Sequence, residues 1–264
     1  MVVQHNMQAM NASRVLNVTA GQQAKSSEKL SSGYRINRAA DDAAGLSISE
    51  KMRKQIRGLD RASTNAQDGV SAVQTAEGAL AEVHSMLQRA SELCVQAANG
   101  TNATADITAI SAELRELKTE IERIRDTTDF NGKKMLKDEG INIFVGYQSA
   151  TPDIAINAYS LSTNLGAITD QASAKAMLAQ VSSDIEAVST QRSKFGAVQN
   201  RLEHTIDNLD NVVENVTAAE SRIRDTDMAD EMVKYSKNNI LQQAGQSMLA
   251  QANQSTQGVL SLLQ

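Results

Sequence analysis

A seven-residue repeat of small and apolar side chains is the feature that most constrains the fold of this chain. Between Leu59 and Ala97, such residues recur at alternating steps of three and four, at positions 59, 62, 66, 69, 73, 76, 80, 83, 87, 90, 94 and 97. This spacing forms the stripe along which a helix packs against its neighbours in a bundle or coiled coil. The sequence therefore predicts a helix over about residues 59–98, ended by the Asn99-Gly100-Thr101-Asn102 stretch.

Two further stripes of the same kind follow in the 264-residue chain. The second runs from Ile107 to Ile124, and the third runs from Leu178 to Ile223 with interruptions at Arg192 and Gln199. A short turn between two striped helices makes them antiparallel neighbours. We therefore expect three long helices that pack into a rod, in which the packing face of the third helix is partly hydrated or locally irregular.

Between the second and third stripes the period of the pattern changes to two. Ile141, Ile143, Val145 and Tyr147 alternate with other residues, as do Ile154, Ile156 and Ala158 after Pro152-Asp153, and Phe130-Asn131-Gly132 supplies an earlier turn. Two alternating runs around a turn predict a β-hairpin. Pro152 is the only proline, so nearly the whole remaining chain is free to be helical. The predicted fold is mainly α, a long antiparallel helical rod with a small β region around 130–160 and paired terminal helices.

The two ends of the chain, residues 1–36 and 229–264, have helical apolar spacing and abundant Gln, Ala and Ser. Burial of the large apolar side chains in the C-terminal piece stabilises it by less than the cost of ordering its backbone. An isolated end is therefore predicted to be largely disordered and to fold only against a partner. The apolar residues at 259–263 support this prediction, since they need a partner that buries them.

Composition excludes several classes of protein. The net charge of -5 and the pI near 5.3 argue against nucleic-acid binding, and no apolar run is long enough to insert into a membrane. No catalytic constellation, metal motif or cofactor motif is present: His5, His84 and His204 are far apart, and Cys94 falls on the helical stripe as a small buried residue. We expect the Asp41-Asp42 pair to serve a hinge or a salt bridge between subunits. Without a secretory leader, general rules suggest a cytosolic protein.

Two long segments resemble the hallmarks of bacterial flagellins. The first is Leu30-Ser31-Ser32-Gly33-Tyr34-Arg35-Ile36-Asn37-Arg38-Ala39-Ala40-Asp41-Asp42-Ala43-Ala44-Gly45-Leu46, and the second comprises Ile240-Leu241-Gln242-Gln243-Ala244-Gly245, Met248-Leu249-Ala250-Gln251-Ala252-Asn253 and Val259-Leu260-Ser261-Leu262-Leu263. Phe130-Asn131-Gly132-Lys133-Lys134 is similar to a flagellin turn. Tyr34, Arg38 and Thr256 depart from common forms of the family. Because only residues 160–172 join the β region to the returning helix, the chain resembles a minimal flagellin that lacks the variable outer domains.

The resemblance implies a structural subunit, not an enzyme, that polymerises into the flagellar filament used for motility. It also implies export of the unfolded chain through a flagellar channel to an extracellular location, which overrides the cytosolic reading. The implied partners are further copies of the chain, an export chaperone, and the filament cap and hook-junction proteins. The implied organisation is an inner domain made of residues 1–42 and 223–264 and a rod domain of residues 43–222. The implied polymerisation and chaperone residues are Ile240, Leu241, Leu249, Val259, Leu260, Leu262 and Leu263.

Residues 87–99 resemble the flagellin segment that Toll-like receptor five recognises. By match of residues, Gln88, Arg89 and Leu93 would face that receptor, together with Glu113, although Ala90 and Ser91 depart from common forms. The alternative is that these residues make only rod contacts and contacts between subunits. Two alternatives remain for the whole chain: a hook–filament junction protein, or a cytosolic coiled-coil scaffold, which would explain the stripes but not the apolar C-terminal residues.

Overall fold

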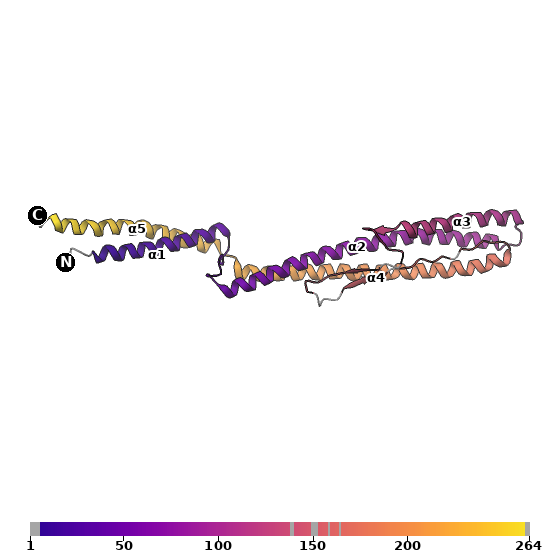
Figure 1. The fold of residues 1–264 in the computed structure, drawn as a ribbon, viewed down its shortest axis with the longest axis horizontal. Helices are drawn as coiled ribbons and strands as arrows, with labels where there is room; N and C mark the ends of the chain where they lie inside the picture. The colour runs from indigo at the N-terminus through magenta and orange to yellow at the C-terminus, as the bar shows by residue number, and fades with distance from the viewer. Residues whose placement is uncertain (1–5, 138–139, 149–152, 158, 164, 262–264) are drawn as a thin grey trace. The chain divides into compact units, whose positions relative to one another are not determined.

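The computed structural model describes residues 6–137, 140–148, 153–157, 159–163 and 165–261, and the side chains of 256–261 are outside this description. The described residues form five helices and four short strands: α1 (Met7–Ser32), α2 (Ala43–Ala97), α3 (Thr104–Thr127), β1 (Asp129–Phe130), β2 (Lys133–Lys134), β3 (Ile141–Ile143), β4 (Ile154–Ile156), α4 (Gln171–Arg224) and α5 (Met228–Ser261) (Figure 1). The prediction of a mainly helical fold with a small β region is confirmed.

The chain divides into two compact units. Unit 1 comprises Met1–Lys54 and Asn215–Gln264, and unit 2 comprises Gln55–Glu214. The division falls inside α2 and α4, so each of these helices contributes to both units. The domain limits expected from the sequence, at 42/43 and 222/223, stay a prediction.

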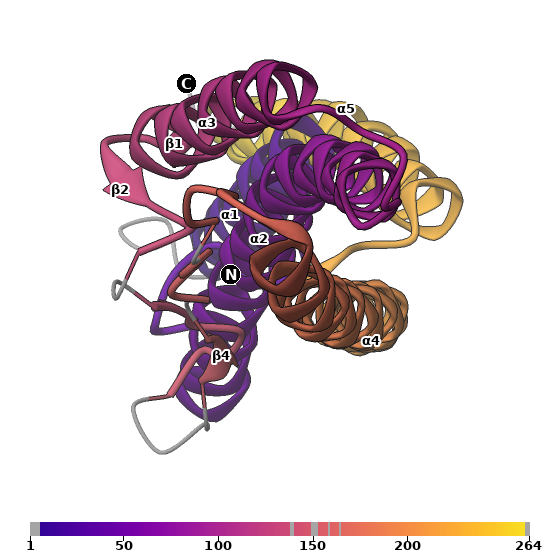
Figure 2. The same ribbon diagram turned by 90° about the vertical axis from the view of Figure 1, so that its right-hand side faces the viewer.

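Unit 2 contains the rod and almost all of the buried apolar core. The predicted stripe of α2 lies at the centre of this core, since Leu80, Val83, Leu87 and Cys94 are all 0% exposed. The other two predicted stripes pack against it from α3 and α4, where Leu114 and Phe195 are each 1% exposed. Figure 2 shows these three helices nearly end-on and close together. The three-helix prediction is therefore confirmed.

The interruption in the third stripe is an ion pair. Arg192 on α4 reaches Glu77 on α2, with 2.6 Å between Arg192 Nη2 and Glu77 Oε1, and both side chains are about one-third exposed. Gln199 donates to Glu203 one turn further along α4. The seam is polar at this level, as the sequence indicated.

The segment between β4 and α4 belongs to the core of unit 2, which the sequence did not reveal. Leu161, Leu165 and Ile168 are 3–4% exposed and join the main apolar cluster. Two backbone bonds fix this segment: Leu161 N donates to Leu136 O, and Ile168 N donates to Ser111 Oγ on α3. The connection is therefore an extended part of the rod rather than a simple linker.

The β region contains two antiparallel hairpins. In the first, the predicted turn has Asn131 at φ 50° and Gly132 at φ 80°, the left-handed geometry that an Asn-Gly pair adopts readily. In the second, Ile141 pairs with Ile156 and Ile143 with Ile154, which confirms the predicted hairpin, although β3 ends before Val145 and Tyr147. Pro152 and Ala158 lie outside the described residues.

The connections of unit 1 are held by local hydrogen bonds. Gly33 ends α1 in the left-handed conformation, at φ 76°, with its N–H donated to Lys29 O. Tyr34 then forms an antiparallel bridge with Asp225, and the Arg224 guanidinium lies 4.7 Å from the centre of the Tyr34 ring. Arg224 also donates to Glu50 at 2.8 Å, which is the main reason that the pKa of Glu50 is lowered.

The Asp41-Asp42 pair makes local backbone contacts. Asp41 Oδ2 accepts from the N–H groups of Asn37 and Arg38, and the bond from Arg38 is the main cause of its lowered pKa. Asp42 Oδ1 accepts from Gly45 N at 2.9 Å and so caps the start of α2. In the folded subunit both carboxylates order the chain between α1 and α2, and the expected role in a hinge or in a salt bridge between subunits stays a prediction.

Candidate functional site

The helices α1 and α5 form an antiparallel pair, with the end of α1 beside the beginning of α5 (Figure 1). At the other end of the pair, Asn6 Nδ2 donates to Ala252 O at 2.9 Å. Midway, a Cβ atom added to Gly245 would lie 3.2 Å from Leu16 Cδ1. The two helices therefore approach closely because a glycine faces a leucine there.

The contact between α1 and α5 contains few large apolar side chains. Its buried members are Thr19, Ser26, Glu231 and Asn238, each 5–8% exposed. Within the described part of unit 1, Ile36 is the only fully buried large apolar side chain. Such a contact gains little from the hydrophobic effect compared with the core of unit 2. The helix pair is thus poorly stabilised by its own packing.

Glu231 is the only acidic side chain among the buried residues of α1 and α5 that the structure describes. It is 5% exposed, and its pKa is lowered chiefly by a hydrogen bond from Ser26 and further by the ammonium group of Lys234, 3.1 Å away. Burial of a carboxylate is costly unless it is paired and hydrogen-bonded, and both conditions are met here. Glu231 fixes the register of α5 on α1 without adding an apolar core.

Many large apolar side chains of α1 and α5 stay exposed instead. Near the start of α5, Met228, Met232 and Val233 are 49–69% exposed. Along the rest of the described pair, seven more are 46–69% exposed: Met7, Met10, Val15, Val18, Ile240, Leu241 and Met248. Arg14 is the only charged residue between positions 7 and 24, and α5 carries no charge after Lys237. An uncharged surface with this many exposed apolar side chains is typical of a protein interface.

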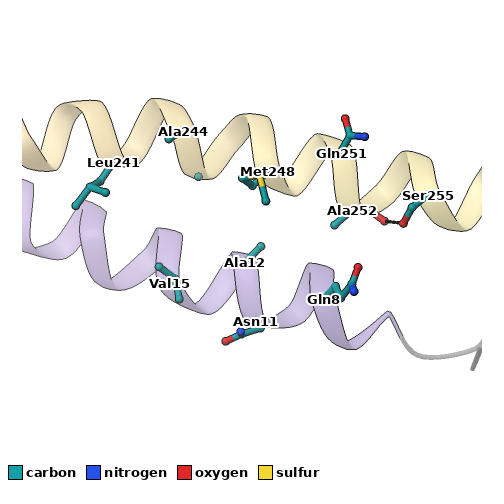
Figure 3. A pocket seen from close by; sticks show the side chains of 11 residues that line it. Gln8, Asn11, Ala12, Val15, Leu241, Ala244, Met248, Gln251, Ala252 and Ser255 are labelled. Carbon is teal, nitrogen blue, oxygen red and sulfur yellow. Dashed lines mark hydrogen bonds between the residues drawn. The ribbon is translucent and has the colours of Figure 1, made fainter.

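Part of this surface is a groove along the pair with a volume of about 550 Å³. Leu241, Met248 and Ala252 extend from α5 toward α1, and Ala12 extends from α1 toward α5 (Figure 3). The lining combines the small side chains of Ala12, Ala244 and Ala252 with the long apolar side chains of Leu241 and Met248. The groove is shaped to accept apolar side chains from another helix. We call it the apolar groove, and its lining residues are Gln8, Asn11, Ala12, Val15, Leu241, Ala244, Gly245, Met248, Gln251, Ala252 and Ser255.

The residues predicted for polymerisation are placed as follows. Ile240 is 67% exposed, Leu241 is 46% exposed and Leu249 is half-buried. The side chains of Val259 and Leu260, and all of Leu262 and Leu263, lie outside the described residues. On α1, the exposed Met7, Met10, Val15 and Val18 belong to the N-terminal end whose apolar helical spacing the sequence shows, but the predicted polymerisation residues lie in α5 and the C-terminal residues alone.

The residues predicted to face a receptor lie on α2 and α3 of unit 2. Arg89 donates to Glu113 at 3.0 Å and pairs with Glu92, and these bonds raise the pKa of Arg89. Gln88 is exposed and lies 3.1 Å from the Nε2 atom of His84. Leu93, by contrast, is 2% exposed in the core, so its side chain is not available to a receptor in the folded subunit.

No group of metal-ligating side chains and no helix suited to cross a membrane occurs among the described residues. Cys94 is fully buried, and burial raises the pKa of its thiol. The structure therefore presents an extended apolar surface as its candidate site.

Comparison with known proteins gives the family. Residues 3–140 match the bacterial flagellin N-terminal helical region, and residues 178–263 match the bacterial flagellin C-terminal helical region. The chain belongs to the bacterial flagellin family. Flagellins are structural proteins and not enzymes, and this chain is a structural subunit of the flagellar filament that polymerises with its own copies. The filament that its relatives form is extracellular.

Relatives of similar length support this assignment along the whole chain. A flagellin of Halalkalibacterium halodurans is 54% identical over 271 residues, and a flagellin of Bacillus subtilis is 47% identical over 303 residues; both alignments cover all of both chains. A flagellar filament 31.3 kDa core protein of Treponema maltophilum is 43% identical over the same full span. The interpretation as a small flagellin is confirmed.

Two solved structures resemble the fold. The crystal structure of Bacillus cereus flagellin has a TM-score of 0.52 at 31% identity and covers 55% of this chain and 88% of that chain. A putative flagellar hook-associated protein of Vibrio parahaemolyticus has a TM-score of 0.61 over 70% of this chain and all of that one. At 13% identity the second likeness shows the fold alone.

Proposed function

We propose that subunits assemble into the filament through the exposed apolar surface of the α1–α5 pair. The observation that carries this proposal is the make-up of unit 1: the buried side chains of the α1–α5 contact are polar, whereas many large apolar side chains of the two helices stay about half exposed or more. Burial of each of the seven exposed side chains in an assembled filament contributes about 1 kcal/mol or more. Assembly thus supplies the apolar burial that the helix pair lacks.

The same surface accounts for the proposed route of export. A helix pair with so little buried apolar area unfolds at small cost, which suits passage of an unfolded chain through a narrow channel. An export chaperone would cover the apolar residues of α5 before assembly, in the manner of a partner that receives an amphipathic helix. The filament cap and the hook-junction proteins would contact the same helices at the ends of the polymer.

The assembly proposal is tested with two charges placed in the apolar groove. Leu241→Glu combined with Met248→Glu should prevent filament formation, because unpaired carboxylates would be buried between subunits. The matched control combines Gln243→Glu with Gln246→Glu, which adds the same charges to exposed positions of α5 that do not line the groove. Electron microscopy and sedimentation of polymerised protein give the result. Filaments of the groove variant at the wild-type critical concentration would refute the proposal.

A second proposed function is contact with Toll-like receptor five through Gln88, Arg89 and Glu113. The supporting observation is that the Arg89–Glu113 pair links α2 to α3 with both side chains about half exposed. Arg89→Ala should weaken binding of the soluble subunit to the receptor ectodomain. Arg123→Ala, which removes an exposed pair with Glu120 on α3, is the control. Equal affinities of wild type and Arg89→Ala would exclude the assignment of Arg89.

A further inference from the structure

A lysine-rich pocket lies between α1 and α5, nearer to the connections of unit 1 than the apolar groove. Lys25 and Lys29 contribute from α1, and Lys234 and Lys237 contribute from α5, around a cavity of about 280 Å³. Lys234 is paired with the buried carboxylate of Glu231. Lys25, Lys29 and Lys237 form no ion pair within the described part of the chain, although the charges of Lys25 and Lys29 add to the backbone hydrogen bonds that lower the pKa of Asp41. The pocket therefore carries an excess of positive charge.

This arrangement is unfavourable for a subunit on its own. Lys25 and Lys29 are four residues apart on one helix, and Lys234 and Lys237 are three apart on the other, so like charges are neighbours along each helix. The only carboxylate that lines the pocket, Glu231, is already shared with Lys234 and Ser26. An external group with several negative charges would relieve the repulsion.

A matching acidic surface lies on α4 in unit 2. Glu203, Asp207, Asp210 and Glu214 follow one another at steps of four, three and four, which places them on a single face of the helix, and all four are exposed. In the described structure none of them forms an ion pair; Glu203 accepts from Gln199, and Asp210 accepts from Ser63 Oγ at 3.1 Å. We call this set the acidic stripe; it spans about 16 Å of helix.

The net charges of the two units are opposite in sign, as are the charges of the pocket and the stripe. Unit 1 has twelve Lys and Arg residues and nine Asp and Glu residues, a net charge of +3. Unit 2 has fourteen Lys and Arg residues and twenty-two Asp and Glu residues, a net charge of -8. Oppositely charged surfaces attract separate copies of one chain to each other and fix the register in which the copies meet.

We propose that the lysine-rich pocket of one subunit binds the acidic stripe of a second copy. This inference rests on the proposed assembly function and adds to it a contact between charged surfaces beside the apolar one. The contact is heterologous, since two different surfaces meet, and repetition of a heterologous contact generates an open polymer rather than a closed dimer. The apolar groove supplies burial, and the charged contact selects the orientation of the incoming subunit.

The test exchanges the charges on each side of the contact. The pocket variant carries Lys25→Glu, Lys29→Glu and Lys237→Glu and keeps Lys234, which holds Glu231. The stripe variant carries Glu203→Lys, Asp207→Lys and Glu214→Lys and keeps Asp210, which accepts from Ser63. At low salt each variant alone should have a critical concentration for polymerisation raised by at least about tenfold. An equimolar mixture of the two should recover filaments, because the reversed pocket of one then meets the reversed stripe of the other.

The controls separate this inference from general charge effects. Lys133→Glu, Lys175→Glu and Lys194→Glu together make the same charge change on exposed residues of unit 2 outside both surfaces, and should polymerise as wild type does. Circular dichroism checks that each variant keeps its helices. If the pocket variant and the stripe variant polymerise like wild type, the inference is overturned and the assembly proposal stands. If the wild-type subunit itself does not polymerise, the assembly proposal is contradicted. Recovery in one chain that carries all six substitutions, without recovery in the mixture, would also overturn it, since the contact would then lie within a subunit.

Discussion

Gly58 and Gly78 lie in the same helix, α2, but the structure predicts opposite consequences for their replacement by alanine. An alanine in an exposed helix interior is favoured over glycine by about 1 kcal/mol. At Gly78 a new Cβ atom meets nothing within 4 Å, so the full gain is expected. At Gly58 the new atom would lie 2.6 Å from Tyr147 Cβ and 3.5 Å from Tyr147 Cα.

The loss at Gly58 follows from that contact. Tyr147 follows the strand β3, and the nearby bond from Asn65 Nδ2 to Phe144 O holds the same segment against α2. To make room, the backbone must move, and overpacking of this kind costs about 1–3 kcal/mol. The loss cancels or exceeds the helix gain, so Gly58→Ala should be less stable than Gly78→Ala by about 1–3 kcal/mol. Tyr147→Ala does not relieve the contact, because the Cβ atom remains.

Thermal unfolding of the soluble subunit, followed by circular dichroism at 222 nm, measures both variants. For a unit of this size, 1 kcal/mol corresponds to about 2–4 °C in Tm. Gly78→Ala should unfold at a higher temperature than wild type, and Gly58→Ala at the same or a lower one. If Gly58→Ala stabilises the subunit as much as Gly78→Ala does, the placement of the hairpin segment on α2 is wrong.

Three further predictions concern the rod. Phe195→Ala should destabilise the soluble subunit by about 3–5 kcal/mol, since Phe195 is 1% exposed, whereas the exposed Val95→Ala should change stability little; urea unfolding compares them. Bonds from Arg125 and Lys137 lower the pKa of Asp126 from 3.8 to about 2, so its contribution to stability is complete above pH 3.8 and is lost as the pH falls toward 2. In Asp126→Asn the dependence of Tm on pH in that window should therefore weaken; an unchanged slope would argue against these contacts. Cys94 should react with a thiol reagent only when the subunit is denatured, and rapid labelling of the native subunit would contradict its burial.

The sequence was informative wherever a periodic pattern and its burial coincide. The stripe of α2 was predicted residue by residue because one continuous helix face packs against two neighbours. The Asn131-Gly132 turn was predictable for a local reason, since both residues adopt positive φ at little cost. The start of α2 at Ala43 was missed because residues 43–58 belong to no heptad stripe; Asp42 begins the helix by accepting from Gly45 N.

Contacts that depend on tertiary placement were not predictable in this way. Leu161, Leu165 and Ile168 have no regular secondary structure, and their burial follows from their packing into the main apolar cluster of the rod. Leu93 lies beside the stripe, and its sequence resemblance could not show that α3 and α4 leave it 2% exposed. In α1 and α5, apolar spacing indicated amphipathic helices, but only the structure shows how many of their large apolar residues stay exposed in the folded subunit.

Hydrogen exchange of the soluble subunit and of the filament is the most direct test of the claim that assembly completes the α1–α5 pair. Because unit 1 has little buried apolar area of its own, amides of α1 and α5 should exchange rapidly in the subunit and become protected in the filament. Amides along the buried stripe of α2 in unit 2 should be protected in both states and serve as the internal reference. Equal protection of α5 and of that part of α2 in the soluble subunit would show that the pair is stable alone and would contradict the account.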